Sequence, residues 1–270
     1  MLLSNLEYIP LRLLRKFVLR DALLLRFGAF FPYYRVNLNQ ADPIRLVDDY
    51  SRHLAHCGFQ PQGRRILEIG VGRTNSVAYE MSARFAPSEV MALEPFVEFS
   101  PAEDARLLAR IADQNRCPEG NLSARVRRIR ELGEIPDGSI DLILSNSVLE
   151  HVNDPGALFT GLRRVLAAGG AMLHLVDYRD HFFKYPYHFL QFRKADWNRW
   201  LNPGDLPVWR IYDHLEQLER CGFSVSVLEE TRDSIAYEKV AAYVSPAYRQ
   251  GDERLQTATA VLWAVVSNLQ

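Results

Sequence analysis

The chain has 270 residues, of which 48% are hydrophobic and 24% are charged, so it can bury a large core and is not expected to be disordered in bulk. Its 32 basic and 33 acidic residues give a formal charge of -1, which argues against a nucleic-acid-binding protein, because phosphate contacts need a basic excess. Three widely spaced cysteines, in no Cys-x-x-Cys pair, argue against a disulfide framework or a zinc site and favour a reducing compartment.

Residues 1–60 are predicted to form a helical N-terminal extension, with one helix from Pro10 to about Phe27. At 100° per residue, its leucines lie opposite a basic sector made of Arg12, Arg15, Lys16, Arg20 and Arg26. One interpretation is that residues 10–27 meet anionic lipid, peripheral to the inner face of a membrane. We favour a helix packed on the domain with a solvated arginine face. Because neither a leader pattern nor an apolar span of roughly 20 residues is present, we expect a cytoplasmic protein.

Short apolar runs alternate with helical patterns over residues 61–180, which is typical of β-α-β units and a parallel sheet. The predicted strands are 65–69, 90–94, 140–145 and 171–177, with a weaker one at 123–130. The predicted helices are 76–85, 101–114 and 154–168. For the last helix, Asp154 is the expected N-cap, Pro155 the first residue and Gly169 the stop signal.

An aromatic insertion over residues 181–212 is expected to follow the fifth strand. A helix should come next, with Asp213 and Glu216 spaced as N-cap and N3 residues and Gly222 at its end. Strands are predicted at 223–228 and 259–266. Residues 61–270 then form one α/β domain, a doubly wound, mostly parallel seven-stranded sheet with an antiparallel edge.

The run Ile66–Asn75, I-L-E-I-G-V-G-R-T-N, places Gly70 and Gly72 between a strand and a helix. Glycines at such a corner let backbone amides approach a ligand, and open α/β sheets bind ligands beyond the carboxyl ends of their strands. A dinucleotide fingerprint would have a third glycine at Asn75, and no Tyr-x-x-x-Lys pair of a short-chain dehydrogenase is present. Glu68 puts a carboxylate at the strand tip, which suits an ammonium group better than a pyrophosphate.

A second acidic residue, Glu94, ends the next predicted strand, 26 residues after Glu68. A carboxylate there can accept two hydrogen bonds from a ribose diol. Either acid alone could simply cap a strand, but the pair at this spacing favours a nucleoside with a cationic end.

Three segments together, Ile66–Gly72, Ala92–Pro95 and Gly138–Pro155, resemble those of class I S-adenosylmethionine-dependent methyltransferases, specifically the type 11 domain. The resemblance covers residues 60–180, and S-I-D-L-I followed by S-N-S-V-L-E-H-V-N-D-P is its most specific part. It implies S-adenosylmethionine at the switch point of the sheet, with these residues around it: Glu68, Gly70 and Gly72 at the methionine end, Glu94 at the ribose hydroxyls, Arg130 and Glu131 beside the adenine, Ser145 and Asn146 on the sulfonium side, and His151 in the pocket wall. Two departures stand out: Thr74 replaces a common third glycine, and the segment at Arg130 lacks the usual Gly-Asp-Ala.

The fifth predicted strand ends with Asp177, Asp180 and His181 at the edge that faces the donor methyl. Methyl transfer from a sulfonium is an in-line displacement that depends mainly on alignment, and a hydroxyl nucleophile also benefits from a base. We predict His181 as that base, oriented by Asp177 or Asp180, because histidine titrates near neutrality. Alternatively these residues cap the strand and pin the insertion. No flanking ligand pair supports a metal site there, so no metal is expected.

The insertion is predicted to be a lid over a small-molecule substrate, since its aromatic residues alternate with Arg193, Lys194 and Arg199. Packing of Phe189 and Trp197 in the core is the alternative. The arginines of 124–130 are interpreted as a solvated strand rather than an RNA site. A sugar or glycan precursor is the first hypothesis for the acceptor. A lipid-linked or quinone-like acceptor is the second, and an inactive cofactor-binding scaffold protein is the non-enzyme alternative.

Overall fold

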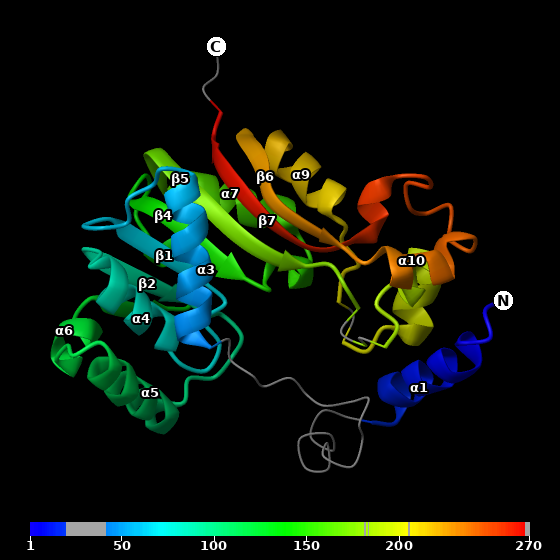
Figure 1. Cartoon of the computed structure of the whole chain (residues 1–270), viewed down its shortest axis with the longest axis horizontal. Coiled ribbons are helices and arrows are strands. Elements are labelled where there is room, and N and C mark those ends of the chain that lie inside the picture. The colour runs from blue at the N-terminus through cyan, green and yellow to red at the C-terminus, as the bar shows by residue number, and fades with distance from the viewer. Residues whose placement is uncertain (20–41, 181, 183, 205, 268–270) are drawn as a thin grey trace.

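A computed structural model describes residues 1–19, 42–180, 182, 184–204 and 206–267. Seven strands form one sheet in the order β3-β2-β1-β4-β5-β7-β6 (Figure 1). β7 pairs antiparallel with β5 and β6, and the other pairs are parallel. The doubly wound, mostly parallel α/β sheet is therefore confirmed, and its antiparallel strand, β7, lies between β5 and the edge strand β6. The strands are β1 (Arg65–Ile69), β2 (Glu89–Leu93), β3 (Val126–Ile129), β4 (Ile140–Asn146), β5 (Leu166–Asp177), β6 (Phe223–Arg232) and β7 (Thr257–Val266).

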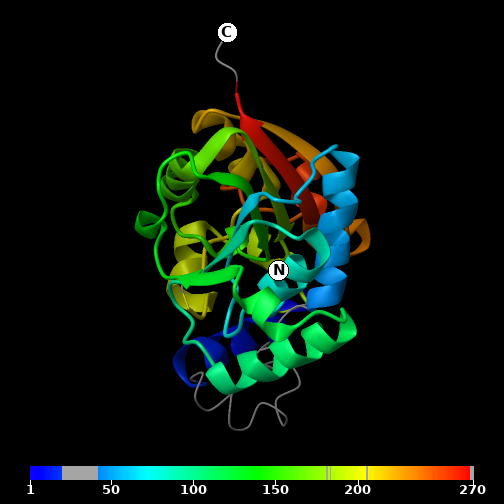
Figure 2. The ribbon, with the colours of Figure 1, turned by 90° about the vertical axis from the view of Figure 1, so that its left-hand side faces the viewer.

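Helices cover both faces of this sheet. Figure 2 shows α3 and α7 on opposite sides of the strands. One face carries α3 (Pro43–His56) and α4 (Ser76–Phe85), with α5 (Pro101–Gln114) and the short α6 (Glu119–Ser123) packed against α4. The other face carries α7 (Pro155–Val165) and α9 (Ile211–Arg220).

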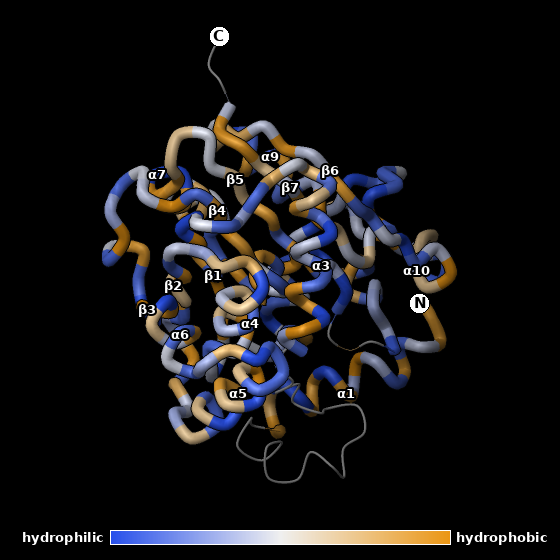
Figure 3. Tube along the Cα trace, turned by 60° about the vertical axis from the view of Figure 1, so that its left-hand side comes forward, coloured by the Kyte–Doolittle hydropathy of each residue, from blue (hydrophilic) through white to orange (hydrophobic). Residues whose placement is uncertain are grey.

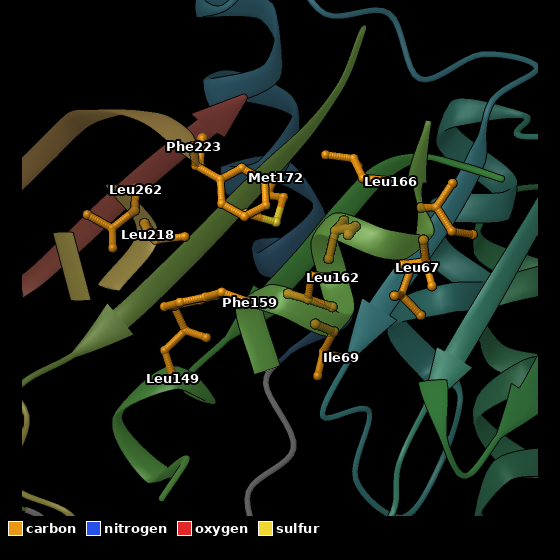
Figure 4. Close-up of a cluster of buried hydrophobic side chains, with 14 of the residues drawn as sticks. Leu67, Ile69, Leu149, Phe159, Leu162, Leu166, Met172, Leu218, Phe223 and Leu262 are labelled. Carbon is orange, nitrogen blue, oxygen red and sulfur yellow. The ribbon is translucent and has the colours of Figure 1, made fainter. Parts of the chain in front are cut away.

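The core has two layers because side chains alternate along each strand. On β1, Ile66 packs toward α3 and α4, whereas Leu67 packs toward α7. Figure 4 shows the second layer, in which Phe159 and Leu162 of α7 meet strand residues. In Figure 3 hydrophobic residues follow the central strands, as expected for a parallel sheet buried on both faces. The chain order reverses between β1 and β4, so the ligand crevice is expected at their carboxyl ends.

The predicted end of α7 and the predicted start of α9 were wrong. α7 ends at Val165, and Gly169 lies inside β5 rather than past a helix end. Its φ of 75° occurs in the stretch between Leu166 and Ala171, where the β4–β5 register shifts, so the glycine allows a bulge in the strand. In α9 the capping box joins Arg210 as N-cap to Asp213 as N3, one turn earlier than predicted.

The N-terminal helix α1 spans Asn5–Phe17, so Pro10 lies inside the helix and not at its first turn as predicted. Residues 20–27 of the predicted helix lie outside the described residues. α1 packs on the insertion that follows β5, where Tyr8 is completely buried. This second core also includes residues of α10 (Ser234–Ala241) and the segment after it.

The orientation of α1 contradicts the expected solvated arginine face. Arg12 is buried, with 8% of its surface exposed, and forms an ion pair with Asp180. Apolar side chains point to solvent instead: Leu6 is 66% exposed, Phe17 58% and Val18 59%. Among the described helices, none combines the length and the apolar character that crossing a membrane requires.

The two described helices of residues 1–60 pack on different cores. α1 belongs to the core formed with the insertion, whereas α3 covers the sheet beside α4. The insertion itself consists of short helices: η4 (His188–Gln191), α8 (Lys194–Asp196) and η5 (Trp197–Leu201). Most of its aromatic side chains are buried against one another and against Tyr8, which supports the core-packing alternative for Phe189 and Trp197.

Candidate active site

The glycine corner follows β1 directly. Gly70 has φ of 78° and Gly72 has φ of 66°, a region that L-residues with a Cβ rarely adopt. A Cβ at Gly70 would also overlap the side chain of Val148, in the turn after β4. Gly70 is thus required both by its backbone conformation and by the close approach of the two strand ends at the switch point.

Glu94 follows β2 and contacts the glycine corner. Its Oε2 accepts a hydrogen bond from the Gly72 N–H at 2.9 Å, and its Oε1 accepts from the N–H groups of Phe96 and Val97, both at 3.0 Å. The side chain is 5% exposed. A carboxylate offers about four acceptor positions, so these three backbone donors leave capacity for a ligand hydroxyl.

Glu68 lies on β1, on the side of the sheet that faces Tyr50 of α3 and Arg128 of β3. It is 4% exposed, and its Oε2 has no hydrogen-bond partner among the described residues. Burial raises the pKa of Glu68 to about 8, and the charge of Arg128 opposes this shift. An orphaned, buried carboxyl oxygen beside the glycine corner fits a cationic ligand group, which would restore its missing partner.

Arg128 was missed as a site residue because its strand was interpreted as solvated. Its Nη1 donates to Asn75 Oδ1 at 3.0 Å and its Nη2 donates to the Gly72 carbonyl oxygen, so it holds the glycine corner from the side of β3. Asp104 of α5 holds the same loop: its Oδ1 accepts from the Asn75 N–H at 2.6 Å. These contacts join residues that are 29 to 56 positions apart in the sequence. No local pattern or spacing could therefore have indicated them.

Arg130 and Glu131 lie just beyond β3, at the edge of the sheet where the ligand crevice is expected. Both side chains are exposed. Their backbone N–H groups donate to Glu134 Oε1 at 2.7 and 3.1 Å, which closes the turn of η2 (Leu132–Glu134). The only support for their predicted place beside an adenine is their location at the carboxyl end of β3.

Ser145 and Asn146 end β4 and face different surroundings. Ser145 is completely buried, and its Oγ shares a hydrogen bond of 2.7 Å with His174 Nδ1 of β5. Its hydroxyl therefore serves the interior of the sheet. Asn146 is half-buried at the strand end, and the next residue, Ser147, has φ of 53°. Of the two predicted residues, Asn146 is the better placed to meet a ligand in the crevice.

A cavity of ≈ 240 Å³ opens beyond the end of β5, between α1 and the insertion. Charged side chains of α1 and of the segments after β4 and β5 line it, and Leu206, Pro207, Val208 and Trp209 of the insertion form an apolar strip. His151 also lines it, and its predicted role at the cofactor stays a prediction.

Asp177 and Asp180 line the same cavity, and each contacts an arginine. Arg179 donates to Asp177 through Nε at 2.9 Å and through Nη2 at 2.6 Å. Asp180 accepts from Arg12 and, at 3.0 Å, from the Tyr8 hydroxyl. His181, the predicted base, lies outside the described residues, so its pairing with Asp177 stays a prediction. Across the described chain, no group of three or more metal-binding side chains is present.

A further acidic residue of the cavity, Glu150, was not predicted as a site residue. It belongs to η3 (Leu149–His151), directly after β4, and is 7% exposed. Its Oε1 accepts from the Asp177 N–H at 3.4 Å, whereas its Oε2 is buried with no hydrogen-bond partner among the described residues. Glu150 is part of the sequence motif L-E-H-V, but only the structure shows that this residue is buried beside the cavity.

Comparisons with known proteins agree with this geometry. Residues 67–174 match the family described as "Methyltransferase domain". A ubiquinone biosynthesis O-methyltransferase of Neisseria meningitidis is 23% identical over 206 residues, which cover 72% of this chain and 79% of the relative. The structure of a putative sarcosine dimethylglycine methyltransferase from Galdieria sulphuraria superposes with a TM-score of 0.50 at 17% identity, over 91% of this chain and 98% of that one. Geranyl diphosphate C-methyltransferase from Streptomyces coelicolor A3(2) gives a TM-score of 0.50 at 17% identity, over 83% and 80%. The structural likeness supports the fold.

Proposed function

We propose that this chain, which belongs to the S-adenosylmethionine-dependent methyltransferases, methylates a small acceptor with an apolar or aromatic body, held in the cavity beyond β5. The observation that carries the proposal is the position of two acids at the glycine corner, with the cavity at the carboxyl ends of the neighbouring strands. S-adenosylmethionine, when bound, supplies a methyl group on a sulfonium that leaves as a neutral thioether.

In this proposal the chain's own residues bind and align the two reactants. Glu94 accepts a hydrogen bond from a ribose hydroxyl, since its position and its one remaining acceptor site suit that contact. Glu68 accepts from the ammonium group of the methionine end, which would favour its charged form in spite of burial. Gly70 and Gly72 let the backbone approach the cofactor. Alignment of acceptor, methyl and sulfur supplies a large part of the rate in such a displacement.

The character of the cavity favours the quinone-like hypothesis over the sugar hypothesis. A sugar would stack on an aromatic face, but the ring of Trp197 already stacks on Tyr8, with centroids 6.1 Å apart, and the Arg12 guanidinium lies 4.9 Å from its centroid. The apolar strip from Leu206 to Trp209 instead suits an apolar body. The similarity to a ubiquinone O-methyltransferase also favours a quinone-like acceptor.

Contact with a membrane surface is supported by α1, although by a different face from the one predicted. Its outward apolar residues Leu6 and Phe17 are more than half exposed, and Phe17 lies 6.2 Å, between ring centroids, from Trp200, which is 47% exposed. Arg12 and Arg15 of the same helix line the cavity, so the helix that carries the exposed apolar side chains also borders the cavity. This arrangement would admit a lipid-soluble acceptor from the inner face of a membrane to a cytoplasmic enzyme.

Calorimetry with S-adenosylmethionine tests the proposed function first, and absence of binding by the full chain would refute it.

Sedimentation with phosphatidylcholine–phosphatidylglycerol vesicles tests the membrane contact. We expect the full chain to co-sediment and the double variant Leu6→Glu/Phe17→Glu to remain in the supernatant. Ile235→Glu, on α10 and 76% exposed, is the matched control and should still co-sediment. A wild-type chain that stays in the supernatant contradicts the membrane contact.

A further inference from the structure

A buried neighbour and a backbone N–H group at the end of β5 hold the Glu150 carboxyl group at the cavity. Leu149, the preceding residue, is completely buried in the core beside Phe159 of α7. The N–H of Asp177 donates to Glu150 Oε1 at 3.4 Å, which ties the carboxyl to the end of β5. The side chain is therefore held between the two strands whose ends form this part of the site.

The second carboxyl oxygen has no such contact. Glu150 Oε2 is buried and lacks a hydrogen-bond partner among the described residues, although Glu150 itself lines the cavity. An unpaired buried carboxyl oxygen costs about 1–3 kcal/mol. Such groups usually have a partner in the functional state, and a donor on a molecule bound in the cavity would supply one.

Glu150 shares the cavity with other titratable groups, and their arrangement distinguishes it from them. Asp177 binds Arg179 through both oxygens, and Asp180 binds Arg12 through Oδ2 and the Phe182 N–H through Oδ1, so each oxygen of these two acids already has a donor. His151 Nε2 lies 4.0 Å from Glu150 Oε1. The titratable side chains that line the cavity with Glu150 are Arg12, Arg15, His151, Asp177, Tyr178, Arg179 and Asp180.

Burial raises the pKa of Glu150 to about 8, and the negative charge of Asp177 adds to the shift. The backbone N–H groups of Glu150 and Asp177 oppose it. A general base works best when its pKa lies near the working pH, because it is then both available and strong enough to take a proton. The carboxyl group thus combines a free acceptor atom with a suitable proton affinity.

We propose that Glu150 is a catalytic residue, the general base that takes the proton from the acceptor's nucleophilic group in the cavity. This inference rests on the proposed function. In the step, the acceptor heteroatom forms a bond to the methyl carbon as the carbon–sulfur bond breaks and its electron pair passes to sulfur. The acceptor's proton passes to Glu150 Oε2. The products are the methylated acceptor, a neutral thioether and a protonated Glu150, which later releases its proton to solvent.

The test compares the full chain with Glu150→Gln, Glu150→Asp and the control Glu238→Gln, which changes an exposed glutamate of α10. Glutamine keeps the shape of a protonated glutamate, so the variant should fold, and its melting temperature checks this. Calorimetry measures S-adenosylmethionine binding. Transfer of labelled methyl from S-adenosylmethionine to a small-molecule extract of the source cells is measured from pH 6 to 9, and infrared difference spectra follow the buried carboxyl over the same range.

We expect Glu150→Gln to bind the donor like the wild type and to transfer at least about 100-fold less methyl, since a positioned base contributes about that much. Glu150→Asp should recover part of the loss, and Glu238→Gln should match the wild type. Wild-type transfer should rise with pH until the carboxyl group is ionised, in step with an infrared carboxyl band that is lost in Glu150→Gln.

Equal transfer by Glu150→Gln and wild type, with the same pH profile, would overturn the proposal while leaving the proposed function intact. Loss of donor binding in Glu150→Gln would also overturn it, because Glu150 would then belong to the donor site. Failure of the wild type itself to bind the donor would refute the proposed function and would remove the inference with it, so the two failures are distinguishable.

Discussion

Glu94 accepts a hydrogen bond from the backbone N–H of Gly72 at 2.9 Å, which joins the tip of β2 to the glycine corner after β1. The same carboxylate binds the N–H groups of Phe96 and Val97, so it shapes the loop that follows β2 as well. One side chain thus organises both loops that border the proposed ribose position. A carboxylate held by fixed donors is preorganised to accept further hydrogen bonds from a ligand.

We therefore expect Glu94→Gln to weaken S-adenosylmethionine binding by about tenfold to 100-fold, the loss of one hydrogen bond to a charged group. Calorimetry with the purified variant measures this. Glu98→Gln, four residues further along the chain and exposed, is the matched control and should bind normally. Unchanged affinity in Glu94→Gln would contradict the ribose role of this acid.

Gly70→Ala should destabilise the fold more than Gly138→Ala. Both positions have positive φ, 78° and 59°, so both variants incur backbone strain of about 1–2 kcal/mol. Only at Gly70 would the new Cβ also meet the Val148 side chain, whereas nothing lies within 4 Å at Gly138. Overpacking adds about 1–3 kcal/mol. Urea unfolding of the two variants measures the difference. Equal losses in the free energy of unfolding would show that the Val148 side chain moves aside without an energetic penalty.

Replacement of Arg210 should be among the most destabilising changes outside the glycine corner. Arg210 is completely buried and donates to the carbonyl oxygens of Tyr178 at 2.5 Å, Leu255 at 2.8 Å and Thr257 at 2.7 Å. Arg210→Met leaves these buried acceptors unpaired, at about 1–3 kcal/mol for each group. We expect a total loss of about 3 kcal/mol or more in urea unfolding. Arg193→Met, at a side chain that is 78% exposed, is the control. A loss as small as the control's would mean that water replaces the guanidinium.

Acid should destabilise the protein through two buried histidines. Burial lowers the pKa of His174 and of His214 to about 3, below the ordinary value of 6.5. Between pH 6.5 and 3 the unfolded chain therefore binds protons that the folded chain does not. The contribution of the two neutral histidines to the free energy of unfolding is complete above pH 6.5 and is lost as the pH falls toward 3. Because Glu68 and Glu150 oppose this slope above pH 4.5, the test compares variants: in urea unfolding between pH 7 and 4, the wild type should lose more stability on acidification than His174→Gln does. An unchanged slope would contradict the role of His174.

Glu68 and Glu150 should act in the opposite sense at higher pH. Both have pKa values raised to about 8 by burial, above the ordinary 4.5, so the folded chain retains protons that the unfolded chain loses. Stability contributed by their neutral forms is therefore lost as the pH rises from 4.5 toward 8. Glu150→Gln should flatten the decline of unfolding free energy between pH 5 and 8. If the decline is as steep in the variant, Glu150 is ionised in the folded protein at neutral pH.

The central strands and the glycine corner could be predicted from the sequence because their signals are local. β1 was predicted at its observed bounds, as were α4 and α5, since a buried parallel strand is a short apolar run and a surface helix shows a regular apolar stripe. Glu68, Gly70 and Gly72 lie within five residues of one another, so their spacing alone indicated a ligand at a strand end.

Contacts between distant segments were decided by the tertiary structure alone. Arg128 reaches Gly72 across 56 residues and Arg12 reaches Asp180 across 168, and no periodic pattern encodes either pair. The periodicity of α1 predicted a basic side opposite an apolar side, but the structure buries residues of both: Arg12 is buried, and Leu11 and Leu13 pack on the core beside Tyr8. The aromatic insertion and Asp180 provide partners for Tyr8 and Arg12, so the arginine turns inward, whereas Leu6 and Phe17 face solvent. The burial of Glu150 likewise depends on β5 and the insertion, which enclose its carboxyl group. The residues next to Glu150 in the sequence do not determine this burial.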